Sequence, residues 1–268
     1  MLRSLVWSKL SFALLAALLV AGCGLTRNMQ GVDVSDHDGR LFVGGIPVDY
    51  HREVSLLGEL SDVDLKIVLV SPTATIDVVG GPGNTYELVV DLYTEYEDDG
   101  GVELDDGQFS TWSDVEGAVL VNGIRGRLPE GVSLDVRSGT GDVLITSFVH
   151  SRSIKVETGT GSTAVSSCEA NKVSVDSGTG EVRMSECNVD DVRLKLGVGS
   201  LAVSDCVLGH VRGDSGTGDF FFQGSRIDKA SFVSGVGDVR LTDTLVSEIS
   251  SSLGTGKVEM RTSLQDDE

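Results

Sequence analysis

Apolar and polar positions alternate along residues 138–264, and the alternation returns every 19 residues or so. In the first half of each repeat the apolar residues stand two apart, which is the period of a β-strand. These pairs include Val143 and Ile145, Val182 and Met184, Leu201 and Val203, Phe220 and Phe222, Val239 and Leu241, and Val258 and Met260. The second half begins with another apolar column: Ile154, Val173, Val192, Val211, Ala230 and Ile249. Each repeat therefore predicts two strands with a bend between them.

A Gly-x-Gly triplet separates consecutive repeats. The first glycines are spaced by 20 and then five times by 19 residues, at Gly139, Gly159, Gly178, Gly197, Gly216, Gly235 and Gly254. Glycine allows positive backbone torsions and the close approach of neighbouring chains. We interpret the triplets as the corners of successive coils.

A two-strand unit of 19 residues cannot fold alone. Its roughly four inward aliphatic side chains contribute about 6 to 12 kcal/mol, whereas ordering its backbone costs about 20 to 40 kcal/mol. Stacked copies share one core, so the sequence predicts an all-β fold, a parallel β-solenoid of about seven 19-residue coils preceded by irregular β-strands. Column volumes should then compensate: Phe232 falls between Gly213 and Ser251 of the adjacent coils.

The N-terminal segment predicts export. Arg3 and Lys9 precede an apolar run, residues 10–21, that is too short to span a bilayer, as in a secretory signal covering residues 1–22. The following "LVAGC" resembles the lipobox of bacterial lipoproteins, and this resemblance implies lipidation of Cys23 and attachment to the membrane. Gly24 is unlike the aspartate that retains lipoproteins in the inner membrane, which favours the outer membrane, facing the periplasm or the cell surface. An ordinary cleaved signal containing a cysteine is the alternative.

The pattern of apolar and polar residues divides the chain after the signal into four segments. We expect residues 23–53 to be the lipid anchor and tether, residues 54–137 an irregular N-terminal β region, residues 138–264 the regular solenoid and residues 265–268 an acidic tail. Within the irregular part, residues 94–111 read as an acidic, glycine-containing loop or hairpin on a solvated face.

The stretch "LPEGVSLDVRSGTGDV" at 128–143, with the triplets that follow it, resembles the bacterial putative-adhesin family of unknown function, which is related to the GIN-type heads of autotransporter adhesins. The resemblance covers roughly residues 54–264, with "ATIDVVGGPGNTYELVVDLY" at 74–93 as an irregular early strand pair. It implies a β-solenoid without a recognised active site and a role in binding or adhesion.

Composition narrows the possible partners. The chain has 21 Lys and Arg against 41 Asp and Glu, a formal charge of -20, so a nucleic-acid partner is not expected. The 34 glycines and an aromatic content of only 5% favour short strands and turns.

Three cysteines share one column, because Cys168, Cys187 and Cys206 stand 19 residues apart. The same column holds Phe148, Ser225, Thr244 and Ser263, which favours a structural ladder at a buried bend. A disulfide between adjacent coils and a soft-metal site remain the alternatives.

Three other fragments imitate functional motifs. "GDSGTG" at 213–218 resembles the surroundings of a protease nucleophile, and "LGTGKV" at 253–258 resembles the end of a phosphate loop, but the repeat explains both. Asp142, Glu181, Asp219 and Asp238 form a column that could bind calcium between coils, although Ser162, Ser200 and Lys257 interrupt it. We therefore expect no catalytic residue, metal, cofactor or small-molecule substrate.

The expected function is that of a non-enzymatic, lipid-anchored cell-envelope protein whose solenoid binds an envelope protein or a glycan. A structural or signalling scaffold in the periplasm is one alternative. A β-helix enzyme acting on polysaccharide is the other.

Overall fold

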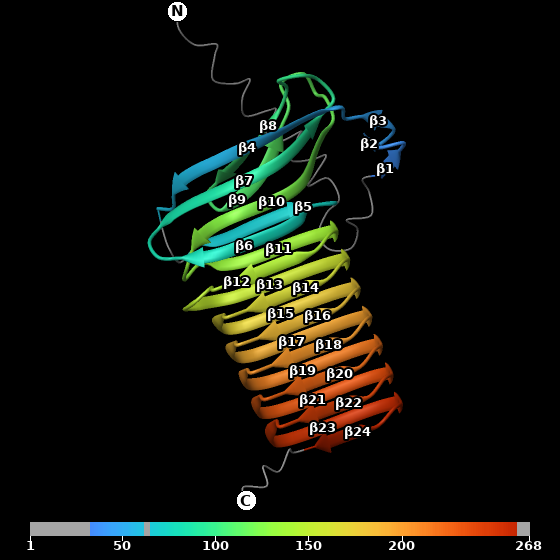
Figure 1. Cartoon of the computed structure of the whole chain (residues 1–268). Coiled ribbons are helices and arrows are strands. Elements are labelled where there is room, and N and C mark those ends of the chain that lie inside the picture. The colour runs from blue at the N-terminus through green and yellow to red at the C-terminus, as the bar shows by residue number, and fades with distance from the viewer. Residues whose placement is uncertain (1–32, 62–64, 262–268) are drawn as a thin grey trace, which may run out of the picture.

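The computed structural model describes residues 33–61 and 65–261, and within these ranges every regular element is a β-strand. The strands form two large sheets, of 11 and 10 strands, and a separate three-stranded sheet (Figure 1). The two large sheets face each other along an elongated body, and the N-terminal strands lie at one end. No described helix is long and apolar enough to cross a membrane.

Seven coils, each made of one long and one short strand, build the regular part. The long strands are β11 (Ser133–Thr140), β13 (Ser151–Thr160), β15 (Glu169–Thr179), β17 (Asn188–Val198), β19 (Val207–Thr217), β21 (Arg226–Val236) and β23 (Leu245–Thr255). The short strands are β12 (Val143–Thr146), β14 (Thr163–Ser166), β16 (Val182–Ser185), β18 (Leu201–Ser204), β20 (Phe220–Gln223), β22 (Val239–Thr242) and β24 (Val258–Arg261). Each strand pairs in parallel with its equivalent one coil on, as in Val182↔Leu201 and Val192↔Val211. The predicted parallel β-solenoid is confirmed.

The core lies between the two sheets, where the alternating apolar columns meet. Val182, Met184 and Val192 are completely buried, as the period of two requires. The volume compensation predicted around Phe232 is also confirmed. A Cβ atom added to Gly213 would stand 2.7 Å from Phe220 and 3.0 Å from Phe232, so the missing side chain makes room for these two rings.

An eighth rung precedes the periodic part. Strands β5 (Lys66–Ser71) and β6 (Thr75–Gly81) pair in parallel with β11 and β12, in the same order along the chain as in every later coil. Ser71 aligns with Ser138, so "SPTA" at 71–74 occupies the place of "SGTG" at 138–141. This rung belongs to the solenoid although it lacks the glycine triplet.

Antiparallel strands cover the N-terminal end of the solenoid. Strand β7 (Thr85–Thr94) pairs with β4 (Tyr50–Glu59) on one side and with β10 (Val119–Pro129) on the other. Strand β10 also pairs with β6, so it separates the two strands that we expected to form a pair within residues 74–93. The acidic stretch forms the hairpin of β8 (Gly101–Asp105) and β9 (Gln108–Trp112).

The segment expected to be a tether contains structure of its own. Strands β1 (Val34–His37), β2 (Arg40–Val43) and β3 (Ile46–Pro47) form the small antiparallel sheet, and β4 follows at once. The predicted signal, Cys23 and the acidic tail at 265–268 lie outside the described residues.

Candidate binding face

The outer face of the long-strand sheet carries an open groove. It crosses β15, β17, β19 and β21 and has a volume of about 420 Å³. Because strand side chains alternate, the outward side chains of these strands form most of its lining, and three inward, buried residues, Val175, Leu194 and Gly213, contribute as well. Its lining residues are Ser174, Val175, Asp176, Arg193, Leu194, Lys195, Arg212, Gly213, Asp214, Ser231 and Val233. We call this surface the groove face.

Two arginines lie side by side on the groove face. Arg193 of β17 is in register with Arg212 of β19, and both side chains are exposed. Arg193 pairs with Asp191 at 3.0 Å, whereas no ion pair of Arg212 occurs within the described part of the chain. Like charges directly opposite each other on a sheet repel, so an anionic group between the two guanidinium groups would relieve this repulsion.

Lys195 adds a third positive charge to the groove face, with its ammonium nitrogen 3.8 Å from Asp176. The neighbouring positions in the arginine column are Ser174 and Ser231, whose short hydroxyl side chains leave the arginines accessible. A planar guanidinium binds a carboxylate, phosphate or sulfate through two parallel hydrogen bonds. The groove face thus presents three cations, beside the carboxylates of Asp176 and Asp214, on a chain that is otherwise strongly acidic.

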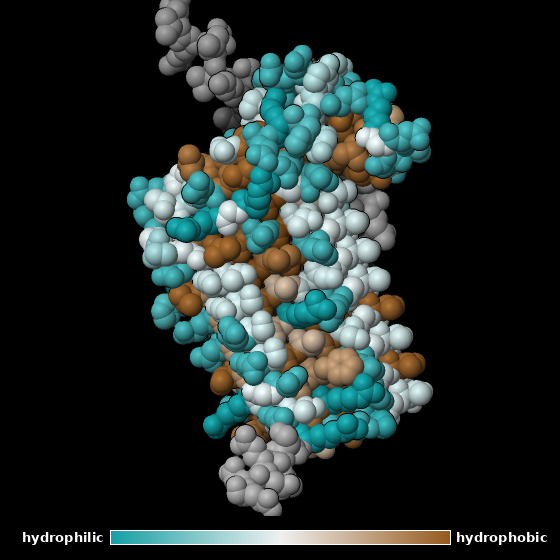
Figure 2. Space-filling view, viewed as in Figure 1, coloured by the Kyte–Doolittle hydropathy of each residue, from teal (hydrophilic) through white to brown (hydrophobic). Residues whose placement is uncertain are grey.

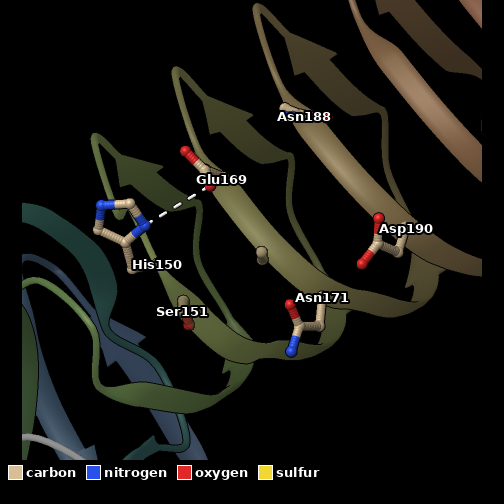
Figure 3. A pocket seen from close by; sticks show the side chains of 7 residues that line it. His150, Ser151, Glu169, Asn171, Asn188 and Asp190 are labelled. Carbon is tan, nitrogen blue, oxygen red and sulfur yellow. Dashed lines mark ion pairs between the residues drawn. The ribbon is translucent and has the colours of Figure 1, made fainter.

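A second, smaller hollow of about 80 Å³ lies where the first coil has one extra residue (Figure 3). His150 lies beside Glu169 there, with 3.5 Å between Nδ1 and Oε1. Both side chains are largely exposed, at 76% and 50%, so this pair contributes little to stability. The other polar groups that line it are Ser151, Asn171, Asn188 and Asp190.

A buried carboxylate links the solenoid to the N-terminal strands. The side chain of Asp135 in β11 is 1% exposed and accepts hydrogen bonds from Lys66 in β5, at 2.6 Å, and from Arg137, at 2.9 and 3.0 Å. Burial acts to raise the pKa of Asp135, but the hydrogen bonds from the two cations outweigh it, so the pKa lies below its ordinary value. Asp135 is therefore ionised at neutral pH.

The predicted cysteine ladder lies at the bend between the short and long strands. Cys168, Cys187 and Cys206 are free thiols, at most 2% exposed. Each thiol donates to the carbonyl two residues earlier, at 3.1 to 3.2 Å, and the Cys187 amide donates to the Cys206 sulfur at 3.4 Å. The contact with Cys187 and burial both raise the pKa of the Cys168 thiol, so Cys168 is protonated at neutral pH. Among the described residues no group of cysteines, histidines and acids could hold a metal ion.

The structure places the predicted glycine triplets at the junction of each long strand with the next short one. A Cβ atom on Gly197 would stand 2.4 Å from the Gly178 carbonyl oxygen of the preceding coil. The third residue of the triplet is more constrained, since Gly199 has φ +147° and a Cβ there would stand 1.9 Å from the Gly180 oxygen. Both glycines are thus required by the coil beneath them. Gly139, Gly159, Gly178, Gly216, Gly235 and Gly254 meet the preceding coil in the same way.

The acidic column after the triplets has a local role. The Ser162 amide donates to Asp142 at 2.7 Å, the Asp238 amide to Asp219 at 2.8 Å and the Lys257 amide to Asp238 at 3.0 Å. Each of these carboxylates accepts a backbone hydrogen bond from the next coil, and Arg240 also pairs with Asp219 and Asp238. These bonds account for Asp142, Asp219 and Asp238, whereas Glu181 of the same column pairs with Arg183 at 2.6 Å.

A second recurring feature, a left-handed residue at the bend between each short strand and the next long strand, was not predicted from the sequence. Ser147, Ser167, Glu186, Asp205, Gly224 and Asp243 all have φ between 50° and 59°. They immediately precede the cysteine column, and their period of about 19 residues was visible in the sequence. Residue type gave no signal, because Ser, Glu, Asp and Gly share this position.

The look-alike motifs lack the geometry of an active site. Ser215, in the fragment that imitates a protease, points inward and is 3% exposed. It shares its column with Ser177 and Ser234, which are equally buried. A nucleophile must reach its substrate, so Ser215 belongs to the corner of the coil rather than to a catalytic site.

Comparisons with known proteins find one family and two solved structures to which the chain is similar. The family model described as Toastrack DUF4097 matches residues 95–242. The crystal structure of a putative adhesin from Bacteroides fragilis NCTC 9343 superposes with a TM-score of 0.51 at 15% identity, covering 79% of this chain and 97% of that one. A putative cell adhesion protein from Clostridium sporogenes ATCC 15579 gives a TM-score of 0.32 at 11% identity, covering 79% of this chain and all of that one. No curated protein matches the sequence.

Proposed function

The chain belongs to the Toastrack DUF4097 family, and we propose that it is a non-enzymatic cell-envelope protein, anchored by lipid on Cys23, that binds an anionic envelope polymer with its groove face. The observation that carries this proposal is the in-register pair Arg193 and Arg212 over an open groove of about 420 Å³. The name of the similar Bacteroides fragilis protein, a putative adhesin, is compatible with a binding role.

The shape of the groove face suits a polymer better than a small molecule. Its arginine column follows the solenoid axis, along which successive strands stand about 4.8 Å apart. A carboxylated or phosphorylated polysaccharide lying along this axis would place anionic groups against successive coils. Small-molecule pockets are normally concave and enclose most of their ligand, whereas this groove is open.

Binding should depend on the two arginines. We expect an Arg193→Gln/Arg212→Gln variant to bind polygalacturonate at least tenfold more weakly than the wild type at low salt, as measured by titration calorimetry. A tenfold loss corresponds to about 1.4 kcal/mol, less than two charged hydrogen bonds contribute. The matched control is Arg183→Gln/Arg240→Gln, which removes the same charge from the short-strand sheet. Equal affinities of the two double variants, or no binding by the wild type, would contradict the proposal.

Attachment to the membrane is tested separately. A Cys23→Ser variant should lose incorporation of labelled palmitate and move from the membrane to the soluble fraction. Protease treatment of intact cells then distinguishes a surface adhesin, which is cleaved, from the periplasmic scaffold that we kept as an alternative. Release of new reducing ends from polygalacturonate by the wild type would instead favour the polysaccharide-active enzyme.

A further inference from the structure

Among the described residues, those of the last coil leave the end of the core uncovered. Val258 and Met260 of β24 are 37% and 58% exposed, whereas Val239 and Leu241, the same positions one coil earlier, are 0% and 2% exposed. Val246, Ile249 and Leu253 of β23 also belong to inward columns and are only half-buried. We call these five residues the terminal face. Inward columns that end in apolar side chains expose a continuous hydrophobic patch.

The backbone of the terminal coil is open as well. In earlier coils the last glycine of the triplet donates to the next coil, as Gly218 does to Val236 at 2.9 Å and Gly237 to Thr255 at 2.9 Å. The equivalent amide of Gly256 has no further coil within the described residues. Strands β23 and β24 are the edges of their two sheets, and such edges accept a further strand.

The opposite end of the molecule is built from different strands, which limits how a second copy can dock. Strands β4, β7 and β10 lie over the first rung of the short-strand sheet, and the β8–β9 hairpin continues the long-strand sheet there (Figure 1). The edge strands at this end are β4 and β8, so a second copy stacked head to tail would make a heterologous contact that does not close. A second copy docked tail to tail makes an isologous contact with two-fold symmetry, which closes.

We propose that the terminal face is the interface of a tail-to-tail dimer, in which β23 and β24 each pair antiparallel with the same strand of a second copy. One two-fold axis must then serve both sheets. The columns of Ser251 and Met260 face each other across the core, because Phe232 and Phe222, which belong to these columns, have ring centroids 5.2 Å apart. An axis through Ser251 and Met260 satisfies both sheets.

This register is self-complementary. Ser251 would lie opposite its own copy, where a small side chain fits, and Ile249 would lie opposite Leu253 of the second copy. Glu259 would face Arg261, and Glu248 would face Gly254, so no acid opposes another acid. Both pairings follow from counting residues outward from the axis in antiparallel strands.

Disulfide trapping tests this arrangement in the full-length protein purified in detergent. Residues directly opposite in antiparallel strands have Cα atoms about 4.5 to 5.5 Å apart, within reach of a disulfide. We expect Ser251→Cys to form a covalent dimer upon oxidation, seen on a non-reducing gel. The control Ser231→Cys, exposed on the outer face one coil earlier, should remain monomeric, as should the wild type, whose described thiols are all buried.

A second substitution tests the apolar contact. Met260→Lys places two ammonium groups together on the axis and should reduce cross-linking of Ser251→Cys at least tenfold. The lysine reaches solvent in the monomer, because position 260 is 58% exposed, so the melting temperature should not change. Val207→Lys, at a position 54% exposed in the middle of the solenoid, should leave cross-linking intact. The proposal is wrong if Ser251→Cys cross-links no more than Ser231→Cys, or if Met260→Lys leaves cross-linking unchanged.

Discussion

The seven regular coils and the N-terminal strands solve the same problem, a two-sheet β core, in different ways. In the coils one arrangement recurs: parallel strands in register, glycines at one corner and left-handed residues at the other. The surface repeats too, since pale rows of residues of intermediate hydropathy run along the solenoid (Figure 2). Near the N-terminus the strands are antiparallel, and particular side chains fix their connections.

Two contacts illustrate the second solution. Asp99 is 6% exposed and accepts hydrogen bonds from the Ser113 hydroxyl at 2.7 Å and the Asp114 amide at 2.8 Å. Arg125 of β10 pairs with Glu53 of β4 and with Asp91 of β7, so one guanidinium joins three strands. The difference teaches that contacts between stacked backbones determine the structure of the coils. Hydrogen bonds and ion pairs between particular side chains determine how the N-terminal strands are arranged.

The largest expected effect is at a corner glycine. Gly218→Ala should lower the free energy of unfolding by about 3 kcal/mol or more, because φ is +151° and the new Cβ would stand 1.8 Å from the Gly199 oxygen. Urea denaturation followed by circular dichroism measures the loss. In the same coil, Gly224→Asn should cost less than about 1 kcal/mol, since φ is +58° and asparagine tolerates the left-handed region. Equal losses would refute the assignment of backbone stacking to Gly218.

A smaller effect is expected where the two regions join. Asp135→Asn removes the charge that Lys66 and Arg137 share and should cost about 1.5 to 3 kcal/mol at pH 7. Because the folded-state pKa is lowered, this stabilisation is present above the unfolded-state pKa, about 3.9, and is lost as the pH falls through the folded-state value. The difference between wild type and variant should therefore shrink below about pH 4.

Asp214→Asn is the control for this pH dependence. Asp214 is an exposed acid of the same sheet and has no ion pair within the ranges described, so its substitution should change stability by less than about 0.5 kcal/mol. A loss for Asp135→Asn that stays constant from pH 7 to pH 3 would mean that packing, rather than the charge, is responsible.

The smallest effect is expected in the cysteine ladder. Cys187→Ser should cost less than about 1 kcal/mol, because Ser225 already fills this column, accepts from the Cys206 amide at 3.1 Å and donates to the Gln223 carbonyl at 2.9 Å. Cys187→Ala loses the hydrogen bond that the Cys187 thiol donates to the Ser185 carbonyl at 3.2 Å and should be the less stable of the two variants in urea. If instead serine were much worse than alanine, the apolar character of the thiol would be the property that matters.

The regular coils could be predicted from the sequence because their period makes each column visible. The rung of β5 and β6 could not, and Pro72 and Ala74 show why. A corner glycine is needed only where a preceding coil lies beneath it: a Cβ on Gly139 would meet the Pro72 oxygen at 2.3 Å, and one on Gly141 the Ala74 oxygen at 2.4 Å. The first rung has no coil beneath its own corner, so it carries no triplet.

The pairing of the remaining N-terminal strands could not be predicted from the sequence either, because it follows no period. Strand β10 lies between β6 and β7 through contacts as distant in sequence as Gly123 with Thr75, and no period marks these pairings. The groove face could not be predicted either. The register of Arg193 with Arg212 points to a binding surface only when the ion pairs of Arg193 with Asp191 and of Lys195 with Asp176 are also known. Periodicity reveals columns, but it does not reveal the charges around them.

The dependence of each corner glycine on the coil beneath it also bears on how such a chain can change length. From the second regular coil on, each coil is joined to the next by the same 19-residue offset, as in Gly180, Gly199 and Gly218. Loss or duplication of one full period in the gene would keep every column continuous and place each glycine over another glycine. The reach of this molecule can therefore change over generations in steps of about 4.8 Å without a new fold.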